Sequence, residues 1–488
     1  MDKGILRNVA INLFGLVMPT FVSLVTVPSY IRLLGVERYG VIALVWTLIG
    51  YFSVLDLGMS MAAQNQISKA YASNDADACE RVFWSAFWLN FTTGAIGGLL
   101  IYSGGALYTA YFTHITPELR HEVYLALPWL AVAIPLANVS WVFAGAINGA
   151  ERFGIYNTNQ TIGTFLFQLL PLGAAWAFAP NLQTVLAAAV FARFAAAVLL
   201  GRSALRVLGI RKMRGPRLDT TKALFNFGGW MLIASITTMI ADSLDRMMLG
   251  AGLGARFVTY YTVPQNLVTR LNMVPNALVR TLFPRLSALG REHADEIAAQ
   301  SLQFLNAVFT PIGIGAIVVL QPFLQMWVGP VIAEHGASVG RVLIIAVWLV
   351  GQASVTRILI QSQNNPAAAA RVGLVELPLF AGILWLGIAR FGLPGAAAAV
   401  LLRALFDYVV LLWLSRIHSR TIIVDMFAHL SFLAAALAIA WWLPDALYAI
   451  GAGVVLALAN AVWSVATTPM LRGYARSLLF RLNSRKSA

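Results

Sequence analysis

The sequence predicts an all-α polytopic membrane protein of about 14 transmembrane helices, because apolar segments of spanning length follow one another along almost the whole chain. Hydrophobic residues make up 59% of the 488 residues and charged residues 11%, against ~25% charged in a soluble domain. No soluble fold covers so much apolar surface, so lipid must solvate much of it. The few charges inside the apolar segments predict a polar interior, which is typical of a transporter or a membrane-embedded enzyme.

The spans are placed where ~20 successive residues are predominantly apolar, the length that crosses ~30 Å of hydrocarbon. The first apolar segment has no small-residue cleavage site after a short core, which favours an uncleaved helix over a signal peptide. In order, the predicted spans are 10–34, 39–67, 83–111, 122–150, 156–180, 184–208, 222–251, 256–284, 300–321, 339–362, 368–390, 392–414, 427–443 and 446–467.

The connections between these spans are short. The longest on the outer face, around Pro322–Gly340, has about 20 residues, too few for an extramembrane catalytic domain. Several spans contain proline, which frees a backbone carbonyl and predicts a bend: Pro19 and Pro28, Pro128 and Pro135, and Pro264 and Pro275.

The net charge of +14 is distributed as an orientation signal. When the connections are assigned alternately to the two sides, most basic residues fall on one side, including the cluster from Arg202 to Lys222. The opposite side holds only Arg32, Arg38, Arg120, Arg256, Arg341 and Arg390. Because cytoplasmic loops carry the excess of Lys and Arg, both termini are predicted to be cytoplasmic. The basic cluster then lies beside anionic headgroups, and we expect no nucleic-acid partner.

Cysteine and histidine usage argues against a metal centre or a disulfide. Cys79 is the single cysteine, which excludes an intrachain disulfide and a cysteine-built zinc site. The six histidines lie at loops or predicted segment ends without ligand spacing. We predict no metal and no cofactor.

Two halves of the sequence resemble each other. Asn12-Leu-Phe-Gly15 is echoed by Asn226-Phe-Gly-Gly229, and Ile31-Arg32 by Asp245-Arg246 at the same offset. Ala187–Arg193 likewise matches Ala397–Arg403. Matches in the same order at nearly one offset predict two six-helix lobes in tandem followed by two further helices. Parallel repeats of this kind are typical of rocking-lobe transporters, which favours transport over catalysis.

The predicted organisation has four parts. Residues 1–208 form an N-terminal lobe, and 209–221 form a cytoplasmic linker. Residues 222–414 form a C-terminal lobe, and 415–488 contain the last two spans and a basic cytoplasmic tail.

Most intramembrane charge falls in the second predicted lobe. The candidate site residues are Arg246, Arg270, Arg280, Arg357 and Arg403, with the acids Asp242, Asp245, Asp407 and, in the first lobe, Asp56. Asp242 with Arg246, and Arg403 with Asp407, are spaced for pairing within one helix. Arg270, Arg280 and Arg357 have no acid nearby on their own helix, so they require a partner across the bundle, a water-filled cavity or an anionic substrate. Arg193 also lacks a nearby acid and is interpreted as structural.

The arginine excess points to an anion-binding cavity, because the guanidinium fork matches phosphate. Plain ion pairs and side chains that extend to the interface remain the alternative for these residues.

The N-terminal motifs resemble a known family. An opening Asn-x-x-x-Gly helix, then Tyr30-Ile-Arg-Leu-Leu-Gly35-Val-Glu-Arg-Tyr-Gly40 and Leu55-Asp-Leu-Gly58, is similar to the start of bacterial polysaccharide flippases of the O-antigen and exopolysaccharide type. Gly149-Ala-Glu-Arg-Phe153 resembles their fourth-to-fifth helix connection. These proteins belong to the multidrug/oligosaccharidyl-lipid/polysaccharide exporter superfamily.

The resemblance implies a function. The substrate would be an undecaprenyl-pyrophosphate-linked oligosaccharide, moved by alternating access from the cytoplasmic to the periplasmic leaflet of the bacterial inner membrane. Arg246, Arg270 and Arg403 would contact the pyrophosphate, with Arg280 and Arg357 as further candidates. Asp242, Asp245, Asp407 and Asp56 would tune them or bind a coupling cation. Membrane lipids, a polysaccharide polymerase and a chain-length regulator are the implied partners.

Two other readings stay open. A drug or cation antiporter of the same superfamily would favour an acidic or aromatic cavity, which the arginine excess opposes. A membrane glycosyltransferase or polymerase acting on lipid-linked sugars would need acidic residues in a sizeable outer loop, and the predicted loops are short.

Overall fold

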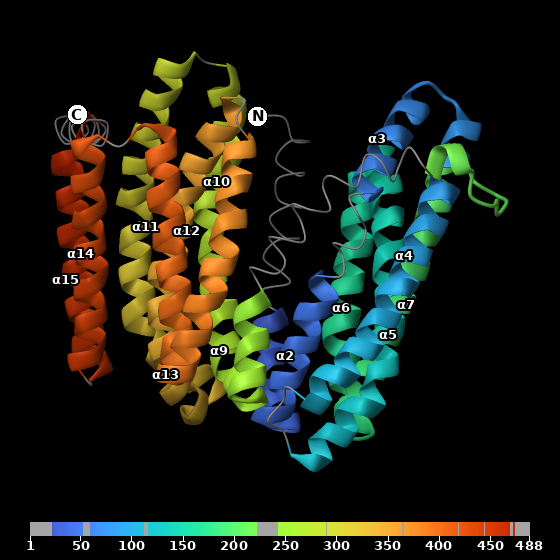
Figure 1. The fold of residues 1–488 in the computed structure, drawn as a ribbon, viewed down its shortest axis with the longest axis horizontal. Helices are drawn as coiled ribbons and strands as arrows, with labels where there is room; N and C mark the ends of the chain where they lie inside the picture. The colour runs from blue at the N-terminus through green and yellow to red at the C-terminus, as the bar shows by residue number, and fades with distance from the viewer. Residues whose placement is uncertain are drawn as a thin grey trace, which may run out of the picture. The chain divides into compact units, whose positions relative to one another are not determined.

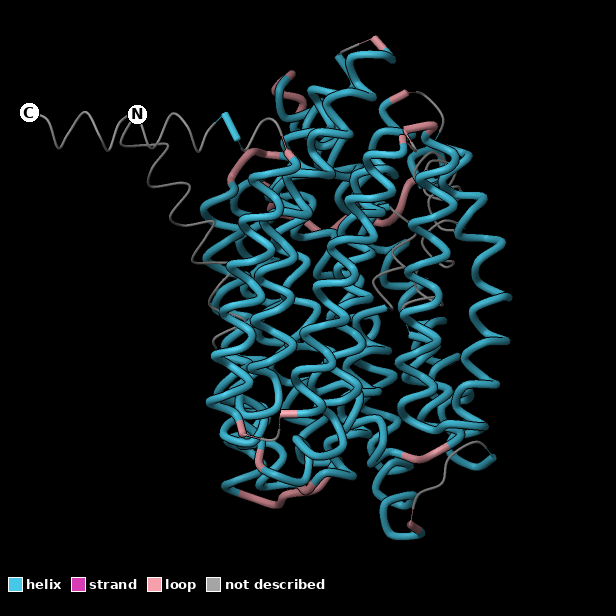
Figure 2. The backbone as a smooth tube through the Cα atoms, turned by 90° about the vertical axis from the view of Figure 1, so that its left-hand side faces the viewer, coloured by secondary structure: helices cyan, strands magenta, loops and turns pink. Residues whose placement is uncertain are grey.

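The computed structural model describes residues 22–51, 59–111, 116–221, 243–288, 290–363, 366–417, 419–443, 445–468 and 472–473, and every statement below concerns these residues. They form helices and short connections, with no strand among them, as Figure 2 shows. This confirms the all-α fold class. Among the described helices, seven are long and apolar enough to cross a membrane: α5, α7, α11, α12, most of α13, α14 and α15. The count of about 14 spans stays a prediction.

The chain divides into two compact units, Met1–Thr259 (unit 1) and Tyr260–Ala488 (unit 2). The four-part organisation predicted from the sequence repeats, with a linker at 209–221, stays a prediction. Figure 1 allows the helices of each unit to be followed by their labels and colours.

Unit 1 is built around one long helix, α5 (Pro117–Gly149), against which its neighbours pack. Helices α3 (Met59–Ala72), α4 (Ala76–Tyr111) and α7 (Leu182–Leu208) lie on it, and α6 (Phe153–Ala177) packs on α7. A helix at Val22–Leu34, α2 (Val36–Tyr51), a helical stretch at 243–252 and the start of α9 (Ala255–Val268) complete the unit.

Local sequence signals set the ends of these helices. Helix α5 begins where the Thr116 side chain accepts a hydrogen bond from the Leu119 amide, with proline at its first position. Helix α7 begins where Asn181 accepts from the Thr184 amide at 2.8 Å. It ends at Gly209, whose φ of 68° is the left-handed conformation that stops a helix. Pro128 and Pro135 lie inside α5, which stays one continuous helix through both.

The predicted cytoplasmic linker is held against α4. The Trp84 and Trp88 indole N–H groups donate to the carbonyl oxygens of Lys212 and Arg214 at 2.9 and 3.0 Å. Arg214 lies 3.2 Å from Glu80 in an ion pair. The two indoles therefore bind the basic segment around Lys212 and Arg214 to α4, in addition to any contact with the membrane interface.

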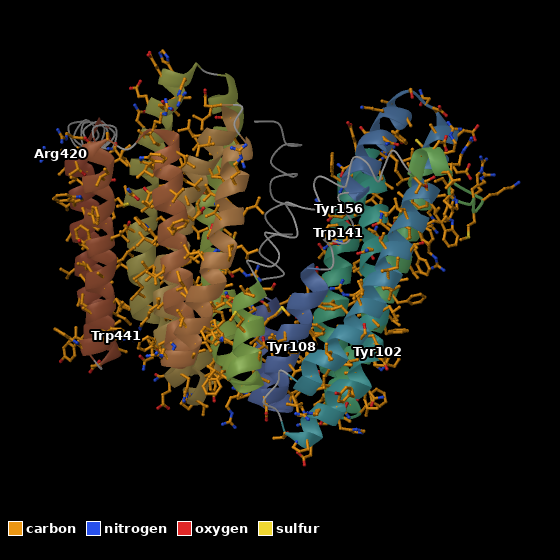
Figure 3. All side chains as sticks on the ribbon, in the orientation of Figure 1. Tyr102, Tyr108, Trp141, Tyr156, Arg420 and Trp441 are labelled. Atoms are coloured by element: carbon orange, nitrogen blue, oxygen red, sulfur yellow. The ribbon has the colours of Figure 1, made fainter. Side chains whose placement is uncertain are left out.

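Unit 2 consists of long helices: α10 (Met273–Ala288) after the short 3-10 helix η2 (Thr269–Asn272), α11 (Arg291–Val328), α12 (Pro330–Ser362), α13 (Pro366–Ser415), α14 (Arg420–Trp442) and α15 (Ala446–Thr467). Helix α12 packs on α11 and α13, and α11 also carries α14 and α15. Arg420 and Trp441 mark the two ends of α14 in Figure 3.

Two glycines make the sharp connections of unit 2. The predicted outer loop Pro322–Gly340 is wrong, since α11 runs to Val328, α12 starts at Pro330, and Gly329 alone joins them with a φ of 95°. Helix α13 breaks at Gly392 (φ 61°, ψ −133°), at the junction of two predicted spans. Both positions need a conformation that side chains disfavour.

Candidate functional site

Four charged side chains on α12 and α13 form a cluster within unit 2. The Arg357 Nη2 lies 2.7 Å from Asp407 Oδ2, and the Arg403 Nε lies 2.5 Å from Glu376 Oε1. Glu376 also interacts electrostatically with Arg357 and Asp407, so the two pairs form one group. The acids are buried between the helices, whereas the Arg357 and Arg403 side chains are 37% and 25% exposed.

The pairing differs from the spacing-based expectation. Arg403 and Asp407 are one helical turn apart, but Arg403 pairs with Glu376 and Asp407 with Arg357. Glu376 and Arg403 lie on opposite sides of the break at Gly392, and this return of the chain places the acid beside the arginine. The Arg403 guanidinium also lies 4.9 Å from the centre of the Phe380 ring. The cluster is therefore electrically balanced, with each arginine neutralised by a carboxylate.

The other predicted site residues are scattered. Asp245 is buried, and its carboxylate accepts from the Arg246 amide at 2.8 Å. Arg270 lies in η2, is exposed, and makes no ion pair with any described residue. Asp56 and Asp242 lie outside the described residues, as does the side chain of Arg280.

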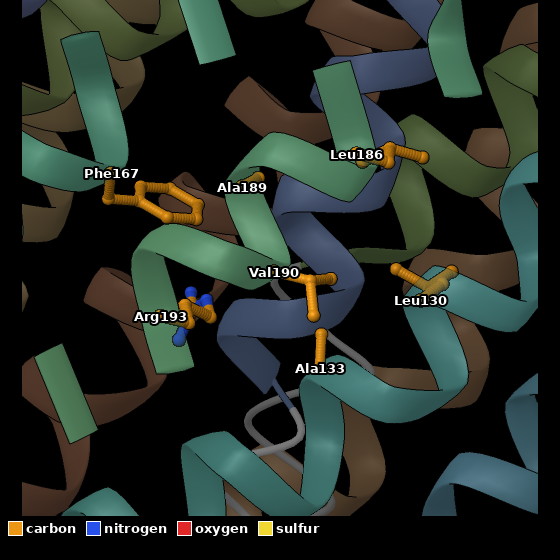
Figure 4. Close-up of a pocket in the computed structure, with 7 residues that line it drawn as sticks. All are labelled: Leu130, Ala133, Phe167, Leu186, Ala189, Val190 and Arg193. Carbon is orange, nitrogen blue, oxygen red and sulfur yellow. The ribbon is translucent and has the colours of Figure 1, made fainter. Parts of the chain in front are cut away.

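A second candidate lies in unit 1, at Arg193 on α7. Its guanidinium is 4.6 Å from the centre of the Phe167 ring, and its Nε is shielded from solvent with no hydrogen-bond partner in the described part of the chain. Figure 4 shows Arg193 and Phe167 at one side of a narrow pocket, which apolar residues of α5 and α7 also line. Among the described residues, no acid pairs with this arginine, and the Phe167 ring is its partner.

A polar cavity of about 200 Å³ opens beside Arg193. Ser140 of α5 and Asn159, Gln160 and Thr164 of α6 supply its polar lining. The volume is many times the ~10–15 Å³ that one water needs, so the cavity can hold a phosphate-sized group. A half-buried arginine beside hydroxyl and amide side chains is suited to bind an anion.

Sequence reasoning misplaced two residues. The structural interpretation of Arg193 stays a prediction, and its lack of a nearby acid was the signal of its unusual environment. Arg341 was placed at the outer surface but is buried on α12, where it donates to the Ile317 carbonyl and to Gln321 Oε1 at 2.9 Å. His429 was placed at a segment end but is buried on α14. In both cases the helix is longer than the apolar window.

The N-terminal motif acts structurally in unit 1. Gly35, with a φ of 84°, ends the helix Val22–Leu34, and Gly40 allows the backbone at Ala255 to approach α2. Arg38 makes a bidentate pair with Glu122 of α5 at 2.6–3.1 Å. Glu122 also accepts from the first amide of α7, that of Leu182, at 3.2 Å. One short motif thus joins four helices of this unit.

Comparison with known proteins places the chain in a family. Residues 5–290, more than half of the chain, match the family described as "Polysaccharide biosynthesis protein". The chain belongs to this family. A candidate O-antigen transporter of Shigella flexneri is 27% identical over 416 residues, covering 84% of this chain and 97% of that protein. A probable flippase of Haloferax volcanii, AglR, is 21% identical and covers 79% of this chain and 78% of its own length.

Solved structures share the fold. The lipid II flippase MurJ in an inward closed conformation matches with a TM-score of 0.72 at 12% identity, covering 94% of this chain and 99% of that chain. An inward-facing multidrug transporter of the MATE family matches with a TM-score of 0.67 at 13% identity, covering 87% and 98%. At such low identity the likeness concerns the fold alone.

Proposed function

We propose that this protein is a flippase that moves undecaprenyl-pyrophosphate-linked oligosaccharides from the cytoplasmic to the periplasmic leaflet of the bacterial inner membrane. Membership of the polysaccharide biosynthesis family supports this proposal, as do an O-antigen transporter candidate and a probable flippase among the relatives. Transport would proceed by alternating access, for which the two compact units provide separate bodies. A polymerase and a chain-length regulator would act on the product.

The observation that carries the proposal is Arg193, which has no acidic partner in the described part of the chain and lies beside a polar cavity. A cation buried in the membrane region is costly unless something pairs with it. The diphosphate of a lipid-linked sugar is an anion of suitable size, and hydroxyl and amide groups beside it can bind the attached sugars. We therefore add Arg193 to the residues proposed to contact substrate.

The other arginines proposed to contact the substrate differ in whether a carboxylate already neutralises them. Arg270, exposed and without a described ion pair, remains a candidate for the pyrophosphate. Arg357 and Arg403 already hold carboxylates, so an anion would have to compete with Asp407 and Glu376. Arg246 and Arg280 remain proposed contacts, and Asp56, Asp242 and Asp245 remain proposed cation or charge-partner sites.

Deletion of the gene in its host, followed by complementation, tests the function. We expect the deletion to strand lipid-linked repeat units on the cytoplasmic leaflet, where an externally added glycosidase cannot reach them in spheroplasts. Wild type should restore exposure, Arg193→Gln should not, and Arg193→Lys should restore it in part because the charge stays while the fork is lost. Arg202→Gln, an exposed arginine on the same helix, is the control.

Each opposite result has a defined meaning. If unpolymerised repeat units reach the outer leaflet in the deletion strain, the flippase proposal is wrong and the protein acts as a polymerase or ligase. Full rescue by Arg193→Gln at wild-type protein level in the membrane would remove Arg193 from the substrate path.

A further inference from the structure

Four polar side chains inside unit 2, none of them part of the ion-pair cluster, are linked by two hydrogen bonds and one close acid–histidine contact. Asn306 of α11 donates through Nδ2 to Asp425 Oδ2 on α14 at 2.7 Å. His429, one turn further along α14, places Nε2 3.4 Å from Asp425 Oδ1. Asn460 of α15 lies with Nδ2 2.9 Å from His429 Nδ1. The network thus links all three helices that pack together at this end of the chain (Figure 1).

The network is almost completely shielded. The exposed fractions are 2% for Asn306, 7% for Asp425, 1% for His429 and 0% for Asn460. Asp425 and His429 lie about 8 and about 14 Å along α14 from Arg420 at 1.5 Å per residue, within a helix long and apolar enough to span the membrane. A carboxylate at such a place is costly unless a positive charge accompanies it.

Among the described residues, the ionisable groups around this pair supply no permanent positive charge. Helix α15 carries no ionisable side chain beyond Tyr448 near its start, and those of α11 are confined to Arg291–Glu296 in its first two turns. On α12, Arg341 and Arg357 are engaged with Gln321 and Asp407. On α13, Tyr408 interacts electrostatically with Asp425. Arg420, the other ionisable group of α14, is exposed at its first position.

Charge balance then depends on His429. With a neutral imidazole the site carries the charge of Asp425 alone, and with a protonated imidazole it becomes a neutral ion pair. The hydrogen bonds can follow either state, since Asn460 presents an amide that exchanges donor for acceptor when it turns by 180°. In the described part of the chain, the Oδ1 atoms of Asn306 and Asn460 and the hydroxyl of Tyr408 are buried without a partner. Buried oxygen atoms without a partner indicate that the network can accept a further hydrogen bond or a positive charge.

We propose that Asp425 and His429 form a proton-binding site, with Asn306 and Asn460 as positioning residues, and that its occupancy modulates transport. Binding a proton at His429 Nδ1 makes the pair neutral and lets α14 pack against α11 and α15. Release leaves a lone carboxylate, which favours a looser arrangement that admits water. The proton-binding step stands alone, and only its effect on transport rests on the proposed flippase function.

Proton binding is tested on the purified full chain in detergent, without substrate. Difference titration against His429→Gln should show one additional proton taken up by wild type. Asp425→Asn should shift the midpoint of that uptake, because the charge partner is lost. His121→Gln, an exposed histidine, also removes one proton, but its titration should not respond to Asp425→Asn.

Three results would overturn the site. Equal titration of wild type and His429→Gln would mean that His429 exchanges no proton. A midpoint that Asp425→Asn leaves unmoved would mean that the two residues do not act as a pair. Sodium-dependent thermal stabilisation that disappears in Asp425→Asn would assign the site to a metal cation. If His429→Gln fails to fold, His429→Asn and Asp425→Asn repeat the titration.

Transport in proteoliposomes completes the test. The initial rate of wild type should change between pH ~6 and ~8 with equal pH on both sides, and His429→Gln should lose that dependence. The same pH response in both proteins would confine the proton to a structural role and overturn the coupling. Absence of transport in wild type at every pH would reject the proposed function and leave the titration result standing.

Discussion

Single residues in this protein take their meaning from partners on other helices. Arg403 and Glu376 are far apart in sequence and lie on the two arms of α13, while Asp407 pairs with Arg357 of α12. Because each carboxylate is more buried than its arginine, loss of the arginine leaves an uncompensated charge inside the bundle. An arginine of this kind contributes to folding whether or not it contacts substrate.

The Arg403–Glu376 pair yields a stability prediction. Arg403→Leu should destabilise the protein by roughly 3–5 kcal/mol, the usual cost of removing one partner of a buried pair. The double variant Arg403→Leu with Glu376→Leu should recover most of that loss, since neither charge then remains. Thermal unfolding in detergent, followed by tryptophan fluorescence, measures both. A double variant no more stable than Arg403→Leu would contradict this account.

At the scale of helices, close backbone contact decides which faces meet. Gly94 and Gly98 of α4 lie against α5, where a Cβ added at Gly94 would be 2.7 Å from the Cα of Pro135. The proline inside α5 is accommodated because α4 presents no side chain at that point. The two longest helices of unit 1 thereby approach more closely than larger residues allow.

Gly94→Ala tests this contact. The added methyl group meets backbone atoms that cannot rotate away, so we expect a loss of about 1–3 kcal/mol in stability. Gly104→Ala on the same helix is the matched control, because nothing lies within 4 Å of a Cβ added there. It should be neutral or slightly stabilising, since alanine favours helix over glycine by ~1 kcal/mol. Equal unfolding temperatures for both variants would contradict a close contact between α4 and α5 at Gly94.

At the scale of the whole molecule, charge asymmetry predicts the orientation in the membrane. Arg341 was counted among the few basic residues of the outer side, but it is buried between α11 and α12. Arg38, another of that group, is paired with Glu122. Arg341 therefore leaves the count of basic residues in outer connections, and cytoplasmic termini stay a prediction.

Reporter fusions at the C-terminus check the orientation. Green fluorescent protein fused there should fluoresce, and alkaline phosphatase fused there should be inactive, because each reporter works on one side of the inner membrane only. A phosphatase fusion at position 445, in the connection between α14 and α15, should be active. The reverse pattern would invert the topology and, with it, the proposed direction of transport.

The class of this protein is predictable from its amino-acid sequence alone. Apolar segments of spanning length, sparse charge and the asymmetry of basic residues follow from the bilayer as solvent, and these are local properties that a window along the chain can read. The motifs at Gly35–Gly40 also resemble the family that residues 5–290 match, and in the structure they join several helices.

Which charged side chains pair with one another depends on the tertiary structure. Pairing of Arg403 with Glu376, burial of Arg341, the cavity beside Arg193 and the Asp425–His429 network all depend on helices distant in sequence. Helical periodicity tells which residues share a face of one helix, but the energy of a buried charge depends on the neighbour across the contact. That neighbour is chosen by packing and by breaks such as Gly392, which spacing along the chain does not encode.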